Sequence, residues 1–235
     1  MCATRSYRAL PALLASMLVA ATMIANSHAS AQEPRADFAQ NRARTELWLA
    51  VPSWPGLSDL EPVAGGAFDD YGLGIGGAIH YPVQRYGGGK IMLGIEGAIQ
   101  AVESNVPVYL DELLARDGYI AVTAKWMPGK SKTLSLDAGL GIHMLDITQL
   151  ESDYYAYLEF KSWEKKALGA LLGVTWDVGA GKPGKDSGLS LGLRVHFVDF
   201  GTVRDEDIFF APVLGTNAGD LAGPIYALQI GYRWR

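Results

Sequence analysis

The sequence predicts an all-β protein, specifically an eight-stranded antiparallel up-and-down transmembrane β-barrel. Eight segments alternate apolar and polar residues, which is the period of a strand. The connections between them are long and short in turn, as in barrels that cross a membrane. Aromatic residues recur on the apolar face beside a turn or the chain end, at Tyr81, Trp126, Trp176 and Trp234. Such a belt of rings suits the level where hydrocarbon meets headgroups.

The first residues predict export. Arg5 and Arg8 precede an apolar run over residues 9–25, and the small residues 29–31 stand before Gln32. This order is typical of a signal peptide cleaved before Gln32 or, as an alternative, before Ser30. The predicted organisation is therefore a signal peptide at 1–31, a short N-terminal segment at 32–41 and a barrel at 42–235.

The eight predicted strands are each close to the ~9 to 11 residues that a tilted strand needs to cross a membrane. They cover residues 42–51, 71–81, 90–101, 118–127, 133–146, 166–178, 188–200 and 224–234. The long connections are 52–70, 102–117, 147–165 and 201–223, and the short ones are 82–89, 128–132 and 179–187. Short periplasmic turns and long external loops produce this order.

One face of these segments is apolar, and the opposite face carries charges among small residues. The rings of the belt belong to the apolar face, which places that face against lipid and the charges in the lumen. A soluble lipocalin-like barrel, with the two faces reversed, is the alternative. Eight strands enclose a space that side chains can fill, and an unpaired buried charge is costly. We therefore predict an ion-paired lumen network of Glu46, Glu96, Lys125, Asp137, Arg194 and Arg233.

The closing segment, residues 225–235, alternates up to Tyr232-Arg233-Trp234-Arg235 and is similar to the terminal strand that outer-membrane barrels present to the barrel assembly machinery. The chain as a whole resembles the small eight-stranded outer-membrane barrels, the group of the membrane domain of outer-membrane protein A and its porin-like relatives. The resemblance implies a location in the cell outer membrane, with outer-membrane lipid and lipopolysaccharide as partners.

Three functions are compatible with this resemblance. The first is a barrel of structural or surface-interaction type with a largely filled polar lumen. The second is a narrow channel for ions or small solutes, opened by rearrangement of the lumen charges. The third is an enzyme that modifies lipid A. The deacylases of this type place a serine two residues after a histidine, whereas Pro82, Leu145 and Val198 follow the three strand histidines at that spacing. We therefore predict no catalytic residues.

Two of those histidines, His143 and His196, are predicted to point into the lumen from neighbouring regions of the barrel. Structural hydrogen bonding is the common role for such residues. Two imidazoles near a carboxylate can also shuttle protons or bind a metal. No metal site is assigned to them on this pattern alone.

The external connections carry the remaining chemistry. Aromatic residues mixed with charges make good binding anchors, and the third long connection contains Tyr154, Tyr155, Tyr157, Phe160 and Trp163. They either bind an extracellular ligand or pack together to close the mouth of the barrel. Acidic residues outnumber basic ones by 25 to 20, which argues against nucleic acid as a partner. No resident cofactor is expected, although Ca²⁺ or Mg²⁺ could bridge the acidic loops to lipid phosphate.

Overall fold

The computed structural model describes residues 43–60, 67–86, 89–105, 112–128, 133–151, 163–178, 187–204, 207 and 218–234. The predicted signal peptide at 1–31 and the segment at 32–41 lie outside the described residues and stay predictions.

Eight long strands make up the described fold, and each corresponds to one predicted segment. They are β1 (Arg44–Ser53), β3 (Leu73–Tyr86), β4 (Gly89–Asn105), β5 (Glu112–Met127), β6 (Leu134–Glu151), β7 (Trp163–Asp177), β8 (Gly188–Arg204) and β9 (Ala218–Trp234). Two short elements lie between β1 and β3: the 3-10 helix η2 (Pro55–Leu60) and the strand β2 (Ala67–Phe68), which pairs with β4. No helix among the described residues is long and apolar enough to cross a bilayer.

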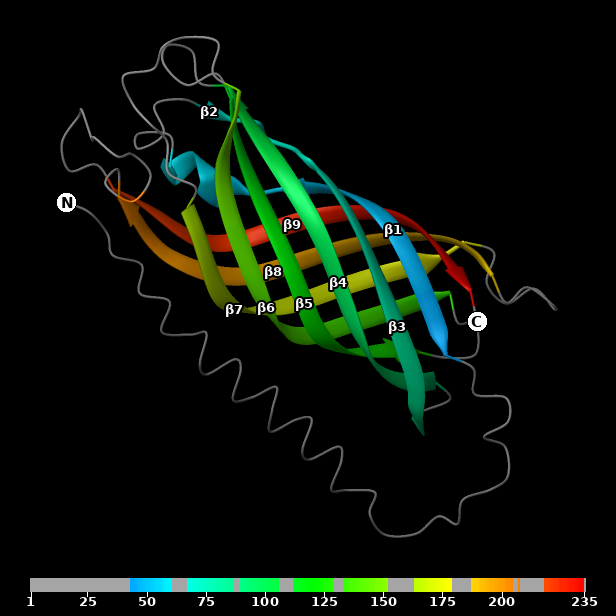
Figure 1. The fold of residues 1–235 in the computed structure, drawn as a ribbon. Coiled ribbons are helices and arrows are strands. Elements are labelled where there is room, and N and C mark those ends of the chain that lie inside the picture. The colour runs from blue at the N-terminus through cyan, green and yellow to red at the C-terminus, as the bar shows by residue number, and fades with distance from the viewer. Residues whose placement is uncertain are drawn as a thin grey trace. The chain divides into compact units, whose positions relative to one another are not determined.

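The eight long strands close into a ring. Each pairs antiparallel with its neighbours in the order β1, β3, β4, β5, β6, β7, β8, β9, and β9 pairs back with β1 (Figure 1). The closing ladder begins at Thr45, opposite Trp234, and ends at Ser53, opposite Tyr226. The predicted eight-stranded antiparallel barrel is therefore confirmed.

The ring has two ends that differ in their connections. At one, the turn end, lie the connections 87–88, 128–133 and 178–187; at the other, the loop end, lie 54–72, 106–111, 152–162 and 205–217. The strands run further toward the loop end than predicted, because β4 continues to Asn105 and β5 begins at Glu112. Much of the predicted loop 102–117 is thus a regular hairpin. The predicted strand ends were wrong there because the outward residues beyond the hydrocarbon layer are mostly polar, so the apolar alternation stops before the strands do.

The outer face of the ring is apolar and the inner face is polar, as a membrane-spanning barrel requires. Val122, Leu191 and Leu193 are exposed on the outside, whereas Glu96 and Lys125 are buried inside. All four predicted belt aromatics are exposed, near the turn-end termini of β3, β5, β7 and β9. Tyr232 adds a ring 6.3 Å from that of Trp234. This distribution rules out the soluble alternative with reversed faces.

The interior is divided along the barrel axis. Charged side chains fill the part nearer the turn end. Toward the loop end lies a continuous apolar cluster, here called the apolar plug: Trp54, Leu57, Leu60, Phe68, Val102, Ala115, Leu145, Ile147, Val198, Phe200, Val203, Leu221 and Ile225. Most of it comes from inward positions of the long strands, but four residues, Trp54, Leu57, Leu60 and Phe68, come from the first connection.

Candidate functional site

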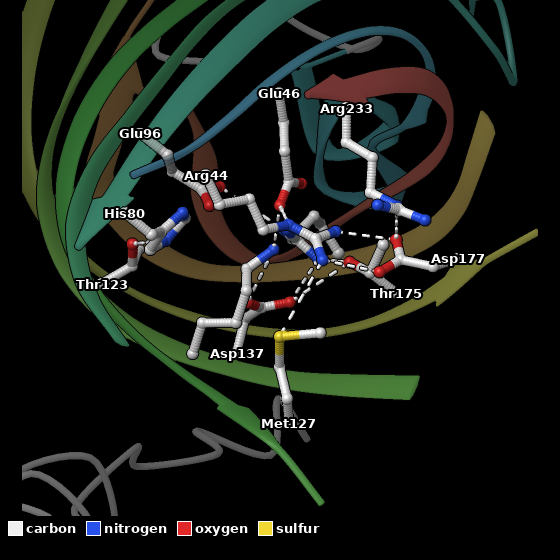
Figure 2. Close-up of polar contacts among 12 residues, drawn as sticks. Arg44, Glu46, His80, Glu96, Thr123, Met127, Asp137, Thr175, Asp177 and Arg233 are labelled. Carbon is white, nitrogen blue, oxygen red and sulfur yellow. Dashed lines mark hydrogen bonds and ion pairs between the residues drawn. The ribbon is translucent and has the colours of Figure 1, made fainter. Parts of the chain in front are cut away.

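Charged side chains from opposite walls meet inside the turn-end part of the barrel (Figure 2). Lys125 Nζ of β5 lies 2.6 Å from Glu46 Oε1 of β1 and 3.3 Å from Asp137 Oδ1 of β6. Arg194 of β8 lies 3.0 Å from Asp137 through Nη1 and 3.4 Å from Glu96 Oε1 of β4 through Nε. Five of the six predicted lumen charges therefore form one connected set.

The sixth, Arg233, connects through a residue that sequence reasoning missed. Its Nε lies 3.1 Å from Asp177 Oδ1, and Arg44 binds the same carboxylate with two nitrogens, at 2.6 and 2.7 Å. Arg44 also donates to Glu46. The signal for Arg44 was available, because it stands two residues before Glu46 and so shares its face.

These eight residues are called the lumen network from here on: Arg44, Glu46, Glu96, Lys125, Asp137, Asp177, Arg194 and Arg233. All are nearly inaccessible to solvent. Four bases face four acids, so the buried charges compensate one another. Each was placed inward by the alternation of its own strand, but the ring closure is what brings the partners together. A network of this kind resists movement of the walls relative to one another, because such movement would separate buried charges from their partners.

The two predicted lumen histidines lie together, next to the lumen network on its loop-end side. Their ring centroids are 5.2 Å apart, and the ring of Tyr119 from β5 stacks near both, at 5.2 Å from His143 and 4.5 Å from His196. His143 Nδ1 lies 3.0 Å from both oxygens of Asp117. The predicted external connection 102–117 ended with Asp117, but this residue is buried in the lumen because β5 begins earlier, at Glu112.

The ring of His143 points its other edge at the barrel wall. A Cβ atom built on Gly169 of β7 would stand 2.9 Å from His143 Nε2. The Cδ2–Nε2 edge of the His143 ring therefore lies against β7. Among the residues that the structure describes, no three His, Cys, Asp or Glu side chains are arranged to hold a metal ion. The third strand histidine, His80, hydrogen-bonds through Nε2 to Thr123 Oγ1 at 2.8 Å.

The apolar plug lies on the loop-end side of the histidines. The first connection enters the mouth of the barrel as η2, a turn secured by the hydrogen bond from Leu57 N to Trp54 O, 3.1 Å long. It lies against β9 at a glycine: a Cβ atom at Gly219 would stand 2.3 Å from the carbonyl oxygen of Asp59. The contribution of η2 to the plug could not be predicted from the sequence, because a 3-10 turn has no apolar periodicity.

Of the predicted surface anchors, Trp163 is the one that the structure describes. It begins β7, is half-buried against the apolar plug, and has Lys165 Nζ 6.0 Å from its ring centroid. Its ring thus belongs partly to the interior. Tyr154, Tyr155, Tyr157 and Phe160 lie outside the described residues, so their predicted role stays a prediction.

Three solved outer-membrane proteins are similar to this chain. OprG of Pseudomonas aeruginosa is 11% identical, with 83% of this chain and 97% of that chain covered and a TM-score of 0.43. Ail, the attachment invasion locus protein of Yersinia pestis, in complex with the heparin analogue sucrose octasulfate, is 12% identical over 82% and 97%, with a TM-score of 0.38. Neisserial surface protein A is 11% identical over 82% and 96%, with a TM-score of 0.35. No protein-family model and no curated protein sequence matches the chain.

Proposed function

We propose that this chain is an outer-membrane barrel that is closed at rest and acts at its loop end, as a structural or surface-interaction protein. The observation that carries the proposal is the layered filling of the lumen. The lumen network joins opposite walls, and the apolar plug occupies the space above it. A solute crossing the barrel would have to displace both layers.

The two layers resist conduction for different reasons. Opening the network separates buried ion pairs, each worth several kcal/mol while its partners stay buried. Opening the plug brings water among apolar side chains, and such constrictions close channels by excluding water. A narrow channel therefore requires a rearranged state, which makes it the second candidate and not the resting one.

The loop end supplies the working surface in this proposal. On the outer face of β5, β6 and β7, the apolar rung Ile120, Ile142 and Leu168 is followed two rungs further on by Arg116, Asp146 and Glu164. Lys166 lies between these rungs and is exposed. These strands thus leave the hydrocarbon and continue as a charged wall. Four of the predicted aromatic anchors belong to the connection 152–162 between β6 and β7.

Several predicted partners belong to the same proposal. Cleavage before Gln32 would deliver the chain to the periplasm, and the barrel assembly machinery would insert it beside lipopolysaccharide. Exposed acids at the loop end, including Asp69, Asp70 and Glu103, support Ca²⁺ or Mg²⁺ bridges to lipid phosphate, because hard carboxylate oxygens suit these cations. No catalytic role is proposed: the pairs His143–Asp117 and His80–Thr123 are buried in the lumen.

Conductance tests the closed state. The purified chain in planar bilayers at neutral pH is expected to show no steady current, and proteoliposomes that contain it should not swell in arabinose. A stable ohmic conductance in most insertions would contradict the proposal. The heat-dependent shift in gel mobility that folded barrels show would verify that the inserted protein is folded.

A matched pair of replacements tests the loop end. Residues 153–161 are replaced by a Gly-Ser linker of equal length, and residues 179–186 at the turn end are replaced likewise as the control. Cells that display each variant are measured for binding to immobilised matrix proteins and glycosaminoglycans. Binding lost only in the first variant supports a surface role, whereas equal binding by all three proteins contradicts it.

A further inference from the structure

The inward side chains change from polar to apolar at one level of the barrel. On four strands the change takes a single inward step toward the loop end: Gln100 to Val102 on β4, Asp117 to Ala115 on β5, His143 to Leu145 on β6, and His196 to Val198 on β8. This boundary separates a part of the lumen that can hold water from a part that excludes it. The charge of a titratable group at this boundary therefore affects whether water enters the plug.

His196 is the boundary residue without a polar partner. It is 1% exposed, and neither Nδ1 nor Nε2 has a hydrogen-bond partner. The neighbouring strands β7 and β9 place apolar Leu171 and Ile225 opposite it. On its lumen side its ring lies near the rings of Tyr119 of β5 and His143 of β6.

The carboxylates of this region are already engaged elsewhere. Asp117 accepts from Gln100 at 2.9 Å and lies 3.0 Å from His143, and Glu96 accepts from the Tyr119 hydroxyl at 3.0 Å and faces Arg194. Among the described residues, none lies within ion-pair distance of His196. A neutral imidazole is tolerated at this position, whereas an imidazolium would be buried two residues from Arg194 with no compensating charge. Such a charge is unstable unless water reaches it.

Unpartnered polar atoms lie mainly on the turn-end side of His196. They include His80 Nδ1, Glu96 Oε2, Ser135 Oγ, Arg194 Nη2 and Arg233 Nη2, whereas the apolar plug contributes Trp54 Nε1. Buried polar groups are nearly always hydrogen-bonded, to water where protein offers no partner. A hydrated path would thus lead from the turn end to His196 and stop at the plug.

We propose that His196 is an acid sensor: its protonation from the turn-end side admits water at the boundary and opens the apolar plug, so that acid converts the closed barrel into a conducting one. The inference rests on the closed resting state proposed above. Val198 and Phe200 follow His196 on the same inward face of β8 and belong to the plug, so hydration of the imidazolium disrupts the packing directly above it. The η2 turn, which is held by packing and not by a strand ladder, is the part that yields.

The direction of the pH response follows from the burial of His196. The closed state favours neutral His196 and the open state accommodates the cation, so a fall in pH favours opening. Histidine is the side chain that titrates in the range from about pH 5 to pH 8. The side of the membrane that is acidified matters as well, because the proposed path for protons to His196 begins at the turn end.

Planar-bilayer recording of the full mature chain tests this, with each chamber acidified separately from about pH 7.5 to about pH 5. The open probability of the parent should rise at least about tenfold on acidification of the turn-end chamber and stay unchanged on acidification of the other. Chamber orientation is assigned by adding protease to one side and scoring cleavage in the connections 152–162 or 178–187.

Three variants make the assignment specific. His196→Gln cannot be protonated and should lose the acid response, and His196→Lys carries a permanent charge and should conduct at neutral pH. His80→Gln removes a buried lumen histidine below the boundary and should keep the acid response, which makes it the matched control. Gel mobility before and after heating establishes that each variant is folded.

The outcomes separate the two proposals. Steady conductance of the parent at neutral pH overturns the closed resting state. A parent that is silent at neutral pH and in acid leaves the closed state standing and overturns the sensor. An acid response retained in folded His196→Gln, or elicited equally from both chambers, also overturns the sensor.

Discussion

Arg194 and Glu96 bind each other across the full width of the barrel. Their Nε and Oε1 atoms are 3.4 Å apart, although β8 and β4 are separated by three strands in either direction around the ring: β9, β1 and β3 one way, and β5, β6 and β7 the other. Both side chains are buried. The pair therefore acts as a strut between opposite walls.

Removing one member of this strut should cost far more than removing an exposed pair. Arg194→Gln and Glu96→Gln should each lower the free energy of unfolding by about 3 to 5 kcal/mol, because each breaks a buried ion pair and leaves the charges of the lumen network unbalanced. The double variant should cost less than the sum of the two. Urea unfolding in detergent micelles, followed by tryptophan fluorescence, measures all three.

The matched control is the pair Arg116–Asp146 on the outer face, in which the arginine side chain is 48% exposed. Arg116→Gln should cost less than about 1 kcal/mol, because water screens an exposed pair. Equal costs at the two sites would show that the lumen network is hydrated and contributes little to stability.

The contact between η2 and β9 should control the plug. Gly219→Ala puts a methyl group where the Asp59 carbonyl oxygen lies, 2.3 Å from the new atom, so η2 must move away from the wall. We expect more frequent current events at neutral pH with the barrel still folded. Gly118→Ala is the control, because the nearest atom to its new methyl group is Met144 Cε at 4.0 Å. Identical recordings from both variants would exclude η2 as a closing element.

A charged substitution on the outer face should destabilise the barrel more the deeper it lies in the membrane. Val122 is 65% exposed in the apolar belt of β5, and Val122→Arg should destabilise the barrel by about 2 to 4 kcal/mol in lipid. Glu103→Arg, near the loop end of β4, should cost at most about 1 kcal/mol. Unfolding from phosphatidylcholine vesicles gives both values. A smaller cost at Val122 than at Glu103 would contradict the placement of the membrane.

Export should leave a defined N-terminus. Protein purified from the outer-membrane fraction is expected to begin at Gln32, or at Ser30 if cleavage follows Ala29, because small residues precede both bonds. Intact-mass spectrometry reads this directly. A protein that retains residues 1–29 in the membrane would contradict the predicted signal peptide.

The sequence by itself determined the strands, their number and the direction of their faces. Alternation is a local property: each residue of a strand points opposite to its neighbour, so Glu46, Lys125 and Arg194 were assigned to the lumen without knowledge of any contact. The belt aromatics then showed which face meets lipid. Arg44 was within reach of the same rule, since it shares the face of Glu46.

Only the tertiary structure decided which inward residues meet and where the apolar plug lies. The partners of Arg194 come from β4 and β6, and the stagger of strands around the closed ring sets that choice, which no single segment encodes. The plug depends on η2, whose residues Leu57 and Leu60 enter the mouth of the barrel from a connection that has no repeating apolar pattern. The position of His196 between an apolar layer on one side and a charged layer on the other follows from both, because burial and pairing are properties of the assembled ring.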